Sequence, residues 1–266
     1  MAVIGSDQRP ALSLNGVSKS FEGIEAVVDV NMEIATGESR ALIGPNGAGK
    51  STLFNLITGE IPRDKGRILV RGWDVTHQPV RRRIELGVGR TYQTSNLFMD
   101  MTVRENLFLS VWKRGRPPAG PLATLFRAWT GYARQFTQVM EVAEQVGLNN
   151  KLEVPVSELS HGEHRQLELG LTLGHKPAML LLDEPMAGLS ANERAFMTNL
   201  IMGLRGWITI LIIEHDIDIA FRVADKVSVL HQGRIIAEGT PSEVRANRLV
   251  QEIYTLSQKG NGRGHA

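Results

Sequence analysis

The sequence of 266 residues contains no cysteine, which excludes disulfides, thiol nucleophiles and cysteine-ligated metal sites. It also has no apolar run of the roughly 18 residues that a membrane-spanning helix needs. The longest runs, Ala178–Leu182 and Ile208–Ile213, have the length of strands. The first residues show no basic segment followed by an apolar stretch, the pattern typical of a secretion signal. These absences predict a cytoplasmic chain that does not cross a membrane by itself.

A large excess of charge of one sign is also missing. The sequence has 30 Lys and Arg residues against 28 Asp and Glu residues, a net charge of +2. This is too small to indicate a nucleic-acid surface, so we expect no nucleic-acid partner. The densest basic cluster, Arg81–Arg83, predicts a solvent-exposed helix face in preference to a phosphate-binding patch. Hydrophobic residues make up 42% of the chain, which is enough for a sizeable core.

Short apolar segments alternate with helical patterns over much of the chain. Strands are expected at Leu12–Phe21, Val27–Ile34, Ser39–Ile43, Ala178–Leu182, Ile208–Ile213 and Val227–Leu230. Helices are expected at Ser51–Thr58, Ala191–Leu204 and Ile217–Ala224. The alternation predicts an α/β fold with a mostly parallel sheet that is covered on both faces.

The pattern changes in the middle of the chain. Helical spacing without intervening strands is found at Val103–Trp112, Leu122–Val146 and Glu163–Leu173. We therefore expect a single domain over residues 1–266, in which a helical subdomain (94–175) is inserted into an α/β core (1–93 and 176–256). The final residues, 257–266, are rich in glycine and are expected to form a disordered tail.

The strongest motif is a glycine-rich loop between an expected strand and an expected helix. It reads Gly44-Pro45-Asn46-Gly47-Ala48-Gly49-Lys50-Ser51-Thr52 and fits the pattern Gly-x4-Gly-Lys-Ser/Thr. Glycines allow backbone N–H groups to converge on a polyphosphate at the start of the helix. Lys50 would reach the β- and γ-phosphates, and the Ser51 hydroxyl would bind Mg²⁺. The motif predicts nucleotide binding.

Two carboxylates follow a buried strand further along the chain. Asp183 ends the apolar run and is positioned to hold Mg²⁺ through water, and Glu184 can polarise a water that attacks the γ-phosphate. Two acidic residues at a strand end also occur in ordinary surface turns, but the preceding phosphate loop favours a catalytic pair. The sequence therefore predicts nucleotide hydrolysis.

Five motifs, taken in order, resemble those of the ATP-binding subunits of ABC transporters. They are GPNGAGKST (Gly44–Thr52), Gln93, LSHGE (Leu159–Glu163), LLLDEP (Leu180–Pro185) and His215 in IIEHD. The resemblance covers the chain from about Leu12 to Leu256. It implies a P-loop ABC cassette with a mostly parallel core sheet, N-terminal antiparallel strands and an inserted α-helical subdomain, with ATP and Mg²⁺ as ligands.

The resemblance also assigns roles to single residues. It makes Gln93 the Q-loop glutamine, which links Mg²⁺ and the attacking water to a membrane partner, and His215 the switch histidine at the γ-phosphate. Phe21 stands where the family places an aromatic ring against adenine. On the residues alone, Gln93 could be a loop amide, His215 a strand cap and Phe21 part of the core.

The signature segment LSHGE departs from the usual LSGGQ. Ser160 and Gly162 are retained, and these supply the hydroxyl and the close backbone approach that a γ-phosphate needs at a helix N-terminus. His161 and Glu163 replace the usual Gly and Gln, and Ser190 replaces the Asp of the family's D-loop. The sequence leaves the effect of these three departures open.

The resemblance implies that two chains close head-to-tail around two ATP molecules, so that Ser160 and Gly162 of one chain cover the ATP of the other. The second ATPase subunit can be identical or a sister chain. Separate integral membrane permeases and an extracytoplasmic solute-binding protein are the implied partners, with the chain at the cytoplasmic face of the inner (plasma) membrane. The segment Thr94–Leu107, with Leu97, Phe98 and Met101, is the expected docking surface.

The D-loop, Ala187–Ser190, and the C-terminal segment Glu238–Leu256 resemble the branched-chain amino acid importers, and LSHG is similar to a urea or short-amide importer. A soluble ABC ATPase for assembly or remodelling and an export ATPase of the lipopolysaccharide type remain alternatives. A cassette that binds ATP without hydrolysis is disfavoured, because the acidic and switch residues are all present.

Overall fold

The computed structural model describes residues 9–91, 97–112 and 133–261. The chain divides into two compact units, each described by itself. The core unit comprises Met1–Arg90, Pro177–Met186 and Ile201–Ala266, and the helical unit comprises Thr91–Lys176 and Ala187–Leu200. The helical unit thus contains residues 187–200, which the expected division assigned to the α/β core. None of the described helices is long and apolar enough to span a bilayer.

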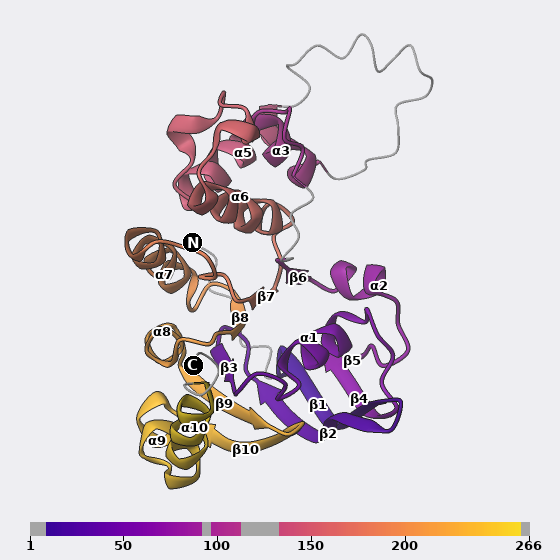
Figure 1. The fold of residues 1–266 in the computed structure, drawn as a ribbon. Coiled ribbons are helices and arrows are strands. Elements are labelled where there is room, and N and C mark those ends of the chain that lie inside the picture. The colour runs from indigo at the N-terminus through magenta and orange to yellow at the C-terminus, as the bar shows by residue number, and fades with distance from the viewer. Residues whose placement is uncertain (1–8, 92–96, 113–132, 262–266) are drawn as a thin grey trace. The chain divides into compact units, whose positions relative to one another are not determined.

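A sheet of six strands forms the centre of the core unit (Figure 1). Its order is β10 (Arg234–Gly239), β9 (Lys226–His231), β3 (Ser39–Ile43), β8 (Thr209–Ile213), β7 (Met179–Asp183) and β6 (Val88–Arg90). All neighbouring pairs are parallel except β10 with β9. Every residue of β3, β7 and β8 is buried, which explains the continuous apolar runs Met179–Leu182 in β7 and Ile210–Ile213 in β8. The predicted mostly parallel core sheet is confirmed.

A second sheet of four strands is built from the N-terminal part of the chain. Its order is β2 (Ile24–Ile34), β1 (Leu12–Phe21), β4 (Lys65–Val70) and β5 (Trp73–Asp74), and all its pairs are antiparallel. Leu14 and Ile34 of this sheet belong to the same hydrophobic cluster as Leu42 and Leu181 of the six-stranded sheet. The predicted antiparallel N-terminal strands are confirmed, and the two sheets share one core.

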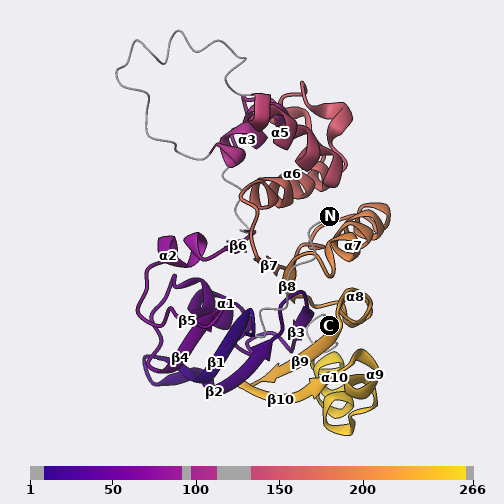
Figure 2. The same cartoon turned by 180° about the vertical axis from the view of Figure 1, so that it is seen from behind.

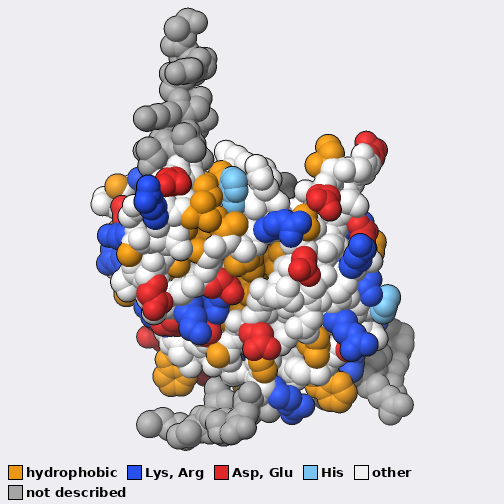
Figure 3. All heavy atoms as spheres, turned by 90° about the horizontal axis from the view of Figure 1, so that it is seen from below, with side chains coloured by type: hydrophobic (Ala, Val, Ile, Leu, Met, Phe, Trp, Pro, Cys, Tyr) orange, Lys and Arg blue, Asp and Glu red, His pale blue; other side chains and the backbone are white. Residues whose placement is uncertain are grey.

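The helices of the core unit are mostly short. They are α1 (Lys50–Thr58), α2 (Val80–Glu85), α8 (Ile217–Val223), α9 (Pro241–Ala246) and α10 (Arg248–Asn261). Helix α10 continues to Asn261, so it extends into the segment 257–266 that the sequence predicts to be disordered. On the face shown in Figure 3, basic and acidic side chains are interspersed, as the balanced composition leads one to expect.

The basic cluster on α2 corrects one sequence interpretation. Arg81 is exposed, but Arg83 is only 3% exposed. The Arg83 guanidinium donates hydrogen bonds to the carbonyl oxygens of Leu56 (2.6 Å) and Ile57 (2.7 Å), at the end of α1. The last carbonyl groups of a helix have no partner within the helix, so Arg83 supplies the donors. The predicted exposed helix face is therefore wrong for Arg83.

The helical unit packs three helices together: α3 (Val103–Val111), α5 (Ala133–Gln145) and α6 (His161–Gly174) (Figures 1 and 2). Gly170 of α6 lies where a side chain would come within 3.1 Å of Leu107 and 3.3 Å of Val146, so glycine permits the close packing. Two 3₁₀ turns, η2 (Asn149–Lys151) and η3 (Val156–Glu158), lead into α6. Helix α7 (Ala191–Leu204) contributes its residues up to Leu200 to this unit.

Candidate functional site

The phosphate loop leaves the buried strand β3 and enters α1 under tight steric constraint. A Cβ atom on Gly44 would lie 2.1 Å from the Leu230 carbonyl oxygen, and one on Gly49 would lie 2.2 Å from the Ala26 carbonyl oxygen. Gly49, at the N-cap of α1, also has a φ of 104°, which L-residues with side chains rarely adopt. Both glycines are therefore required by the backbone path of the loop.

Lys50 is the first residue of α1, and its side chain is turned back onto the loop. Its Nζ donates hydrogen bonds to the carbonyl oxygens of Gly44 (2.7 Å) and Pro45 (3.1 Å). Burial lowers the pKa of Lys50, while the carboxylates of Glu184 and Asp183 oppose this shift. The ammonium group thus lies within the electrostatic reach of both predicted acidic residues, and Asn46, Gly47 and Ser51 of the same loop are exposed.

Asp183 is the last residue of β7 and is 5% exposed. Its Oδ2 accepts a hydrogen bond from Nη2 of Arg90 at 3.0 Å, whereas its Oδ1 is buried and has no hydrogen-bond partner among the described residues. Burial raises the pKa of Asp183, against the opposing charge and hydrogen bond of Arg90. A buried, unpartnered carboxylate oxygen beside a phosphate loop fits a hydrated Mg²⁺ ion.

Arg90 is a site residue that the sequence reasoning missed. Besides Asp183, its guanidinium donates to Oδ1 of Asn55 (2.6 Å) and Oε2 of Glu60 (3.1 Å). These contacts tie the end of β6 to α1 and hold the Asp183 carboxylate in place. The signal available in the sequence was an arginine three residues before Gln93; its partners are distant along the chain.

Glu184 and His215 meet where β7 and β8 end. His215 Nε2 lies 2.6 Å from Glu184 Oε1, and both side chains are partly exposed. Glu184 has a φ of 50°, unusual for a residue with a side chain, and its N–H donates to the Ile213 carbonyl oxygen at 3.0 Å. This left-handed backbone conformation marks the bend that directly follows β7.

Glu214, next to His215, is a second residue that the sequence reasoning missed. It is 4% exposed, and its Oε1 accepts a hydrogen bond from the Met186 N–H at 3.3 Å. Burial raises the pKa of Glu214 to about 7, against hydrogen bonds from the backbone of Met186 and His215 and with further raising by the charge of Glu184. The carboxyl group therefore connects the turn after Glu184 to the backbone of His215.

Phe21 ends β1 with 45% of its surface exposed, so it is not a core residue. The Lys19 ammonium lies 5.3 Å from the centre of its ring. An exposed ring of this kind can stack on a planar base.

The signature segment lies in the helical unit. Ser160 is the N-cap of α6: its Oγ accepts from the Glu163 N–H (3.2 Å), and the Glu163 carboxylate accepts from the Ser160 N–H (2.9 Å). Burial would raise the pKa of Glu163, but hydrogen bonds from Lys151 and Ser160 outweigh it and lower the pKa. Glu163 thus caps the signature helix and pairs with Lys151 at 2.7 Å. Gln93 lies outside the described residues.

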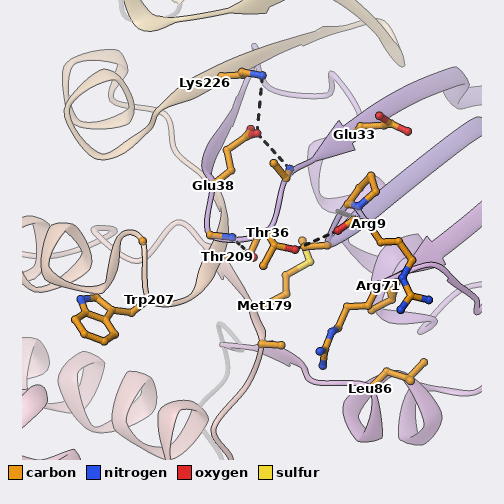
Figure 4. Close-up of a pocket in the computed structure, with 17 residues that line it drawn as sticks. Arg9, Glu33, Thr36, Glu38, Arg71, Leu86, Met179, Trp207, Thr209 and Lys226 are labelled. Atoms are coloured by element: carbon orange, nitrogen blue, oxygen red, sulfur yellow. Dashed lines mark hydrogen bonds and ion pairs between the residues drawn. The ribbon is translucent and has the colours of Figure 1, made fainter. Parts of the chain in front are cut away.

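A pocket of about 660 Å³ lies at the opposite end of the core strands (Figure 4). Its lining includes Glu38, directly before β3, and Met179, Thr209 and Lys226, the first residues of β7, β8 and β9. The phosphate loop, Asp183, Glu184 and His215 instead lie at or after the carboxyl ends of β3, β7 and β8, where parallel sheets bind their ligands. None of the predicted site residues lines this pocket.

Comparison with known proteins agrees with the geometry. Residues 27–187 match the family model described as ABC transporter, and residues 234–255 match the model described as branched-chain amino acid ATP-binding cassette transporter. The chain is 36% identical over 252 residues to the high-affinity branched-chain amino acid transport ATP-binding protein LivG of Escherichia coli (strain K12), covering 92% of this chain and 98% of that protein. The chain belongs to the ABC transporter family. It is an ABC ATPase, as the order of its motifs predicts.

Further members of the ABC transporter family are similar over the same extent. BraF of Pseudomonas aeruginosa, a high-affinity branched-chain amino acid transport ATP-binding protein, is 34% identical over 92% of this chain and 98% of its own length. The crystal structure of an ATP-binding cassette of an ABC transporter in its ADP conformation aligns with a TM-score of 0.80 and 32% identity, over 92% of this chain and 98% of that one. The predicted ABC cassette fold is thereby confirmed.

The core unit of this ABC cassette brings together the phosphate loop, Asp183, Glu184 and His215: both carboxylates act electrostatically on Lys50, and His215 contacts Glu184. The predicted signature residues belong to the helical unit. Arg90 and Glu214 complete the core-unit cluster by holding Asp183 and the turn after Glu184.

Proposed function

We propose that the chain is the ATP-hydrolysing subunit of an ABC importer that takes up branched-chain amino acids or similar small polar solutes. The match of residues 234–255 to the branched-chain amino acid transporter model and the names of LivG and BraF support this substrate class. A single structural observation carries the hydrolytic part: the 2.6 Å contact between Glu184 and His215 beside the phosphate loop.

In the proposed reaction the phosphate loop binds the polyphosphate. Its exposed residues and the N-terminus of α1 supply backbone N–H groups, and Lys50 exchanges its two carbonyl contacts for phosphate oxygens. Glu184 is the general base for the attacking water, and His215 orients the carboxylate and reaches the γ-phosphate. Phe21 stacks on the adenine.

When Mg²⁺ is bound together with the nucleotide, it would neutralise the negative charge that develops on the phosphates. The residues proposed to hold it are Ser51, Gln93 and Asp183, the last through water. The free Oδ1 of Asp183 supports this assignment. Mg²⁺ usually binds through one or two protein groups together with substrate phosphates, which is consistent with so few protein ligands.

The active assembly is proposed to be a head-to-tail pair, in which Ser160 and Gly162 of one chain contact the γ-phosphate held by Lys50 of the other. Mixed dimers test this arrangement. A chain carrying Ser160→Ala should lower hydrolysis of the ATP bound by its wild-type partner, with its own phosphate loop intact. Full activity of a dimer that carries Ser160→Ala in both chains would refute action in trans.

The partners proposed are membrane permeases, which dock on the segment Thr94–Leu107. Residues 94–96 of this segment lie outside the described residues, and Phe98 is 56% exposed. The buried Asn106 holds the Phe98 backbone, accepting from its N–H (3.0 Å) and donating to its carbonyl oxygen (3.1 Å). An exposed ring on a backbone fixed in this way is suited to docking. The chain would then lie at the cytoplasmic membrane face, with an extracytoplasmic solute-binding protein as an indirect partner.

Affinity purification tests the transport function. Tagged Glu184→Gln protein is recovered from detergent-solubilised membranes with ATP and Mg²⁺, and the co-purifying chains are identified by mass spectrometry. Two permeases, with or without a second ATPase, would support an importer. Recovery of soluble partners alone would support an assembly or remodelling ATPase, and lipopolysaccharide-export components would support the export type.

A further inference from the structure

One carboxylate in the helical unit joins the signature segment to the D-loop. Oε1 of Glu193 accepts a hydrogen bond from the Gly162 N–H at 3.1 Å. Oε2 of the same carboxylate accepts from the N–H of Ser190 at 3.0 Å and from its Oγ at 2.7 Å. Glu193 therefore binds Gly162, which the signature segment retains, and Ser190, which replaces the Asp of the family's D-loop.

The Glu193 carboxylate lies closely against Gly162. A Cβ atom on Gly162 would lie 2.3 Å from Oε1 of Glu193, so any side chain at this position would displace the carboxylate. The neighbouring His161 lies against the D-loop residue Gly188: a Cβ atom on Gly188 would come within 2.9 Å of His161 Nε2. The signature segment and the D-loop thus meet at two places.

The Gly162 N–H is one of the helix N-terminal donors that have no partner within α6. The Ser160 hydroxyl satisfies the Glu163 N–H, so the Gly162 N–H is satisfied by Glu193 instead. Hydrogen bonds from Ser190 and then from Gly162 lower the pKa of Glu193, which keeps its carboxylate charged at neutral pH. The charged Glu193 carboxylate therefore accepts the hydrogen bond of the Gly162 N–H, the donor that the proposed function assigns to the partner chain's γ-phosphate.

One N–H proton cannot serve both anions fully, and two negative charges at one donor repel each other. We propose that Glu193 is a positioning residue that holds the Gly162 N–H until the partner chain's γ-phosphate displaces it, and that this exchange sets the ATP concentration at which the pair closes. The displacement also frees Oε1 from the signature segment while Ser190 remains bound, so it transmits γ-phosphate binding to the D-loop. This inference rests on the proposed head-to-tail ATPase.

The chain offers a matched control in Glu243 of α9. Glu243 caps Thr240 with the same pattern of three hydrogen bonds, and its pKa is lowered by the Thr240 backbone and side chain. Glu193 and Glu243 therefore perform the same capping task, and among these contacts Glu193 alone adds the bond to Gly162. A difference between the two variants isolates that bond.

The first measurement needs no nucleotide. In protein labelled with ¹⁵N-glycine, amide hydrogen exchange at Gly162 should be at least about tenfold faster in Glu193→Ala than in wild type, because a hydrogen bond to a charged acceptor is lost. Glu243→Ala should leave this rate unchanged. Equal rates in wild type and Glu193→Ala would overturn the contact, whether or not the chain hydrolyses ATP.

The second measurement determines kcat and KM of ATP hydrolysis for wild type and variants. It also determines, for each protein, the ATP concentration at which half of the chains dimerise. Glu193→Gln keeps an acceptor of the same shape but removes the charge, so KM and the dimerisation midpoint should fall about fivefold, with a smaller change in kcat. Glu243→Gln should change KM by less than about twofold. An unchanged or higher KM, or a fall in kcat alone, would overturn the inference. Absence of hydrolysis and dimerisation in the wild-type protein would instead refute the proposed function, and the exchange with phosphate along with it.

Discussion

His215 Nε2 lies 2.6 Å from Glu184 Oε1, although 31 residues separate the two in sequence. The parallel pairing of β7 with β8 sets Asp183 opposite Ile213, so the residues after both strands emerge side by side. The cluster acts as one unit, and its members should show non-additive effects on mutation.

Glu184→Gln should keep ATP affinity while turnover falls at least about 100-fold, because the amide cannot act as the general base. Calorimetric titration and a phosphate-release assay measure the two quantities, and closed dimers should accumulate with ATP. An unchanged hydrolysis rate would exclude Glu184 as the base.

Lys50→Ala should weaken ATP binding at least about tenfold, or ~1.4 kcal/mol, because it removes the buried ammonium that faces the loop. Lys226→Ala, at the opposite end of the strands beside the pocket of Figure 4, is the matched control and should bind ATP normally. Micromolar binding retained by Lys50→Ala in calorimetry would contradict the phosphate-loop assignment.

Glu214 should make the free energy of unfolding depend on pH. Its pKa is raised to about 7 from an ordinary value of 4.5, so the folded chain binds the proton more tightly than the unfolded chain. Its contribution to stability is therefore present below pH 4.5 and is lost as the pH rises towards 7, on the order of 3 kcal/mol in total.

Glu214→Gln retains an acceptor for the Met186 N–H without the charge. The variant should be more stable than wild type at pH 8, and the difference should shrink as the pH falls to 5. Urea unfolding at several pH values measures this difference. A constant offset between the two proteins across the range would show that Glu214 does not titrate in the window.

Arg83→Met should lower the free energy of unfolding by about 2–3 kcal/mol, because the carbonyl groups of Leu56 and Ile57 lose a charged donor in a buried place. Arg81→Met, on the exposed side of the same helix, should change it by less than about 0.5 kcal/mol. Equal melting temperatures for the two variants would argue against the capping role of Arg83.

The sequence predicts both ends of three elements. The ranges Leu12–Phe21, Ser39–Ile43 and Ala191–Leu204 agree with β1, β3 and α7. Glycines close to their ends, at Gly23, Gly44 and Gly206, make these limits visible locally. The phosphate loop is also visible, because glycine spacing and a following helix are encoded in one short segment.

What the sequence could not predict depends on contacts between distant residues. Arg90 and Arg83 look like ordinary surface arginines until folding brings Asp183 to one and the end of α1 to the other. The short strand β6 has too few residues to show the alternation of a strand. The glycines near the C-terminus predict disorder, although the amphipathic helix α10 continues to Asn261. The roles of the signature residues likewise depend on a second chain.

The steric limits on the phosphate loop affect how variants of this protein will be scored in a mutational survey. Gly44 and Gly49 are pressed against carbonyl groups of β9 and β2, whereas a Cβ on Gly47 would meet nothing within 4 Å. Substitutions at the first two positions will deplete the folded protein in cells and be counted as low abundance. Substitutions at Gly47 carry only the conformational cost of its φ of 77°, so they report on nucleotide contact more directly. A loop that looks uniform in its motif thus contains positions that test folding and a position that tests binding.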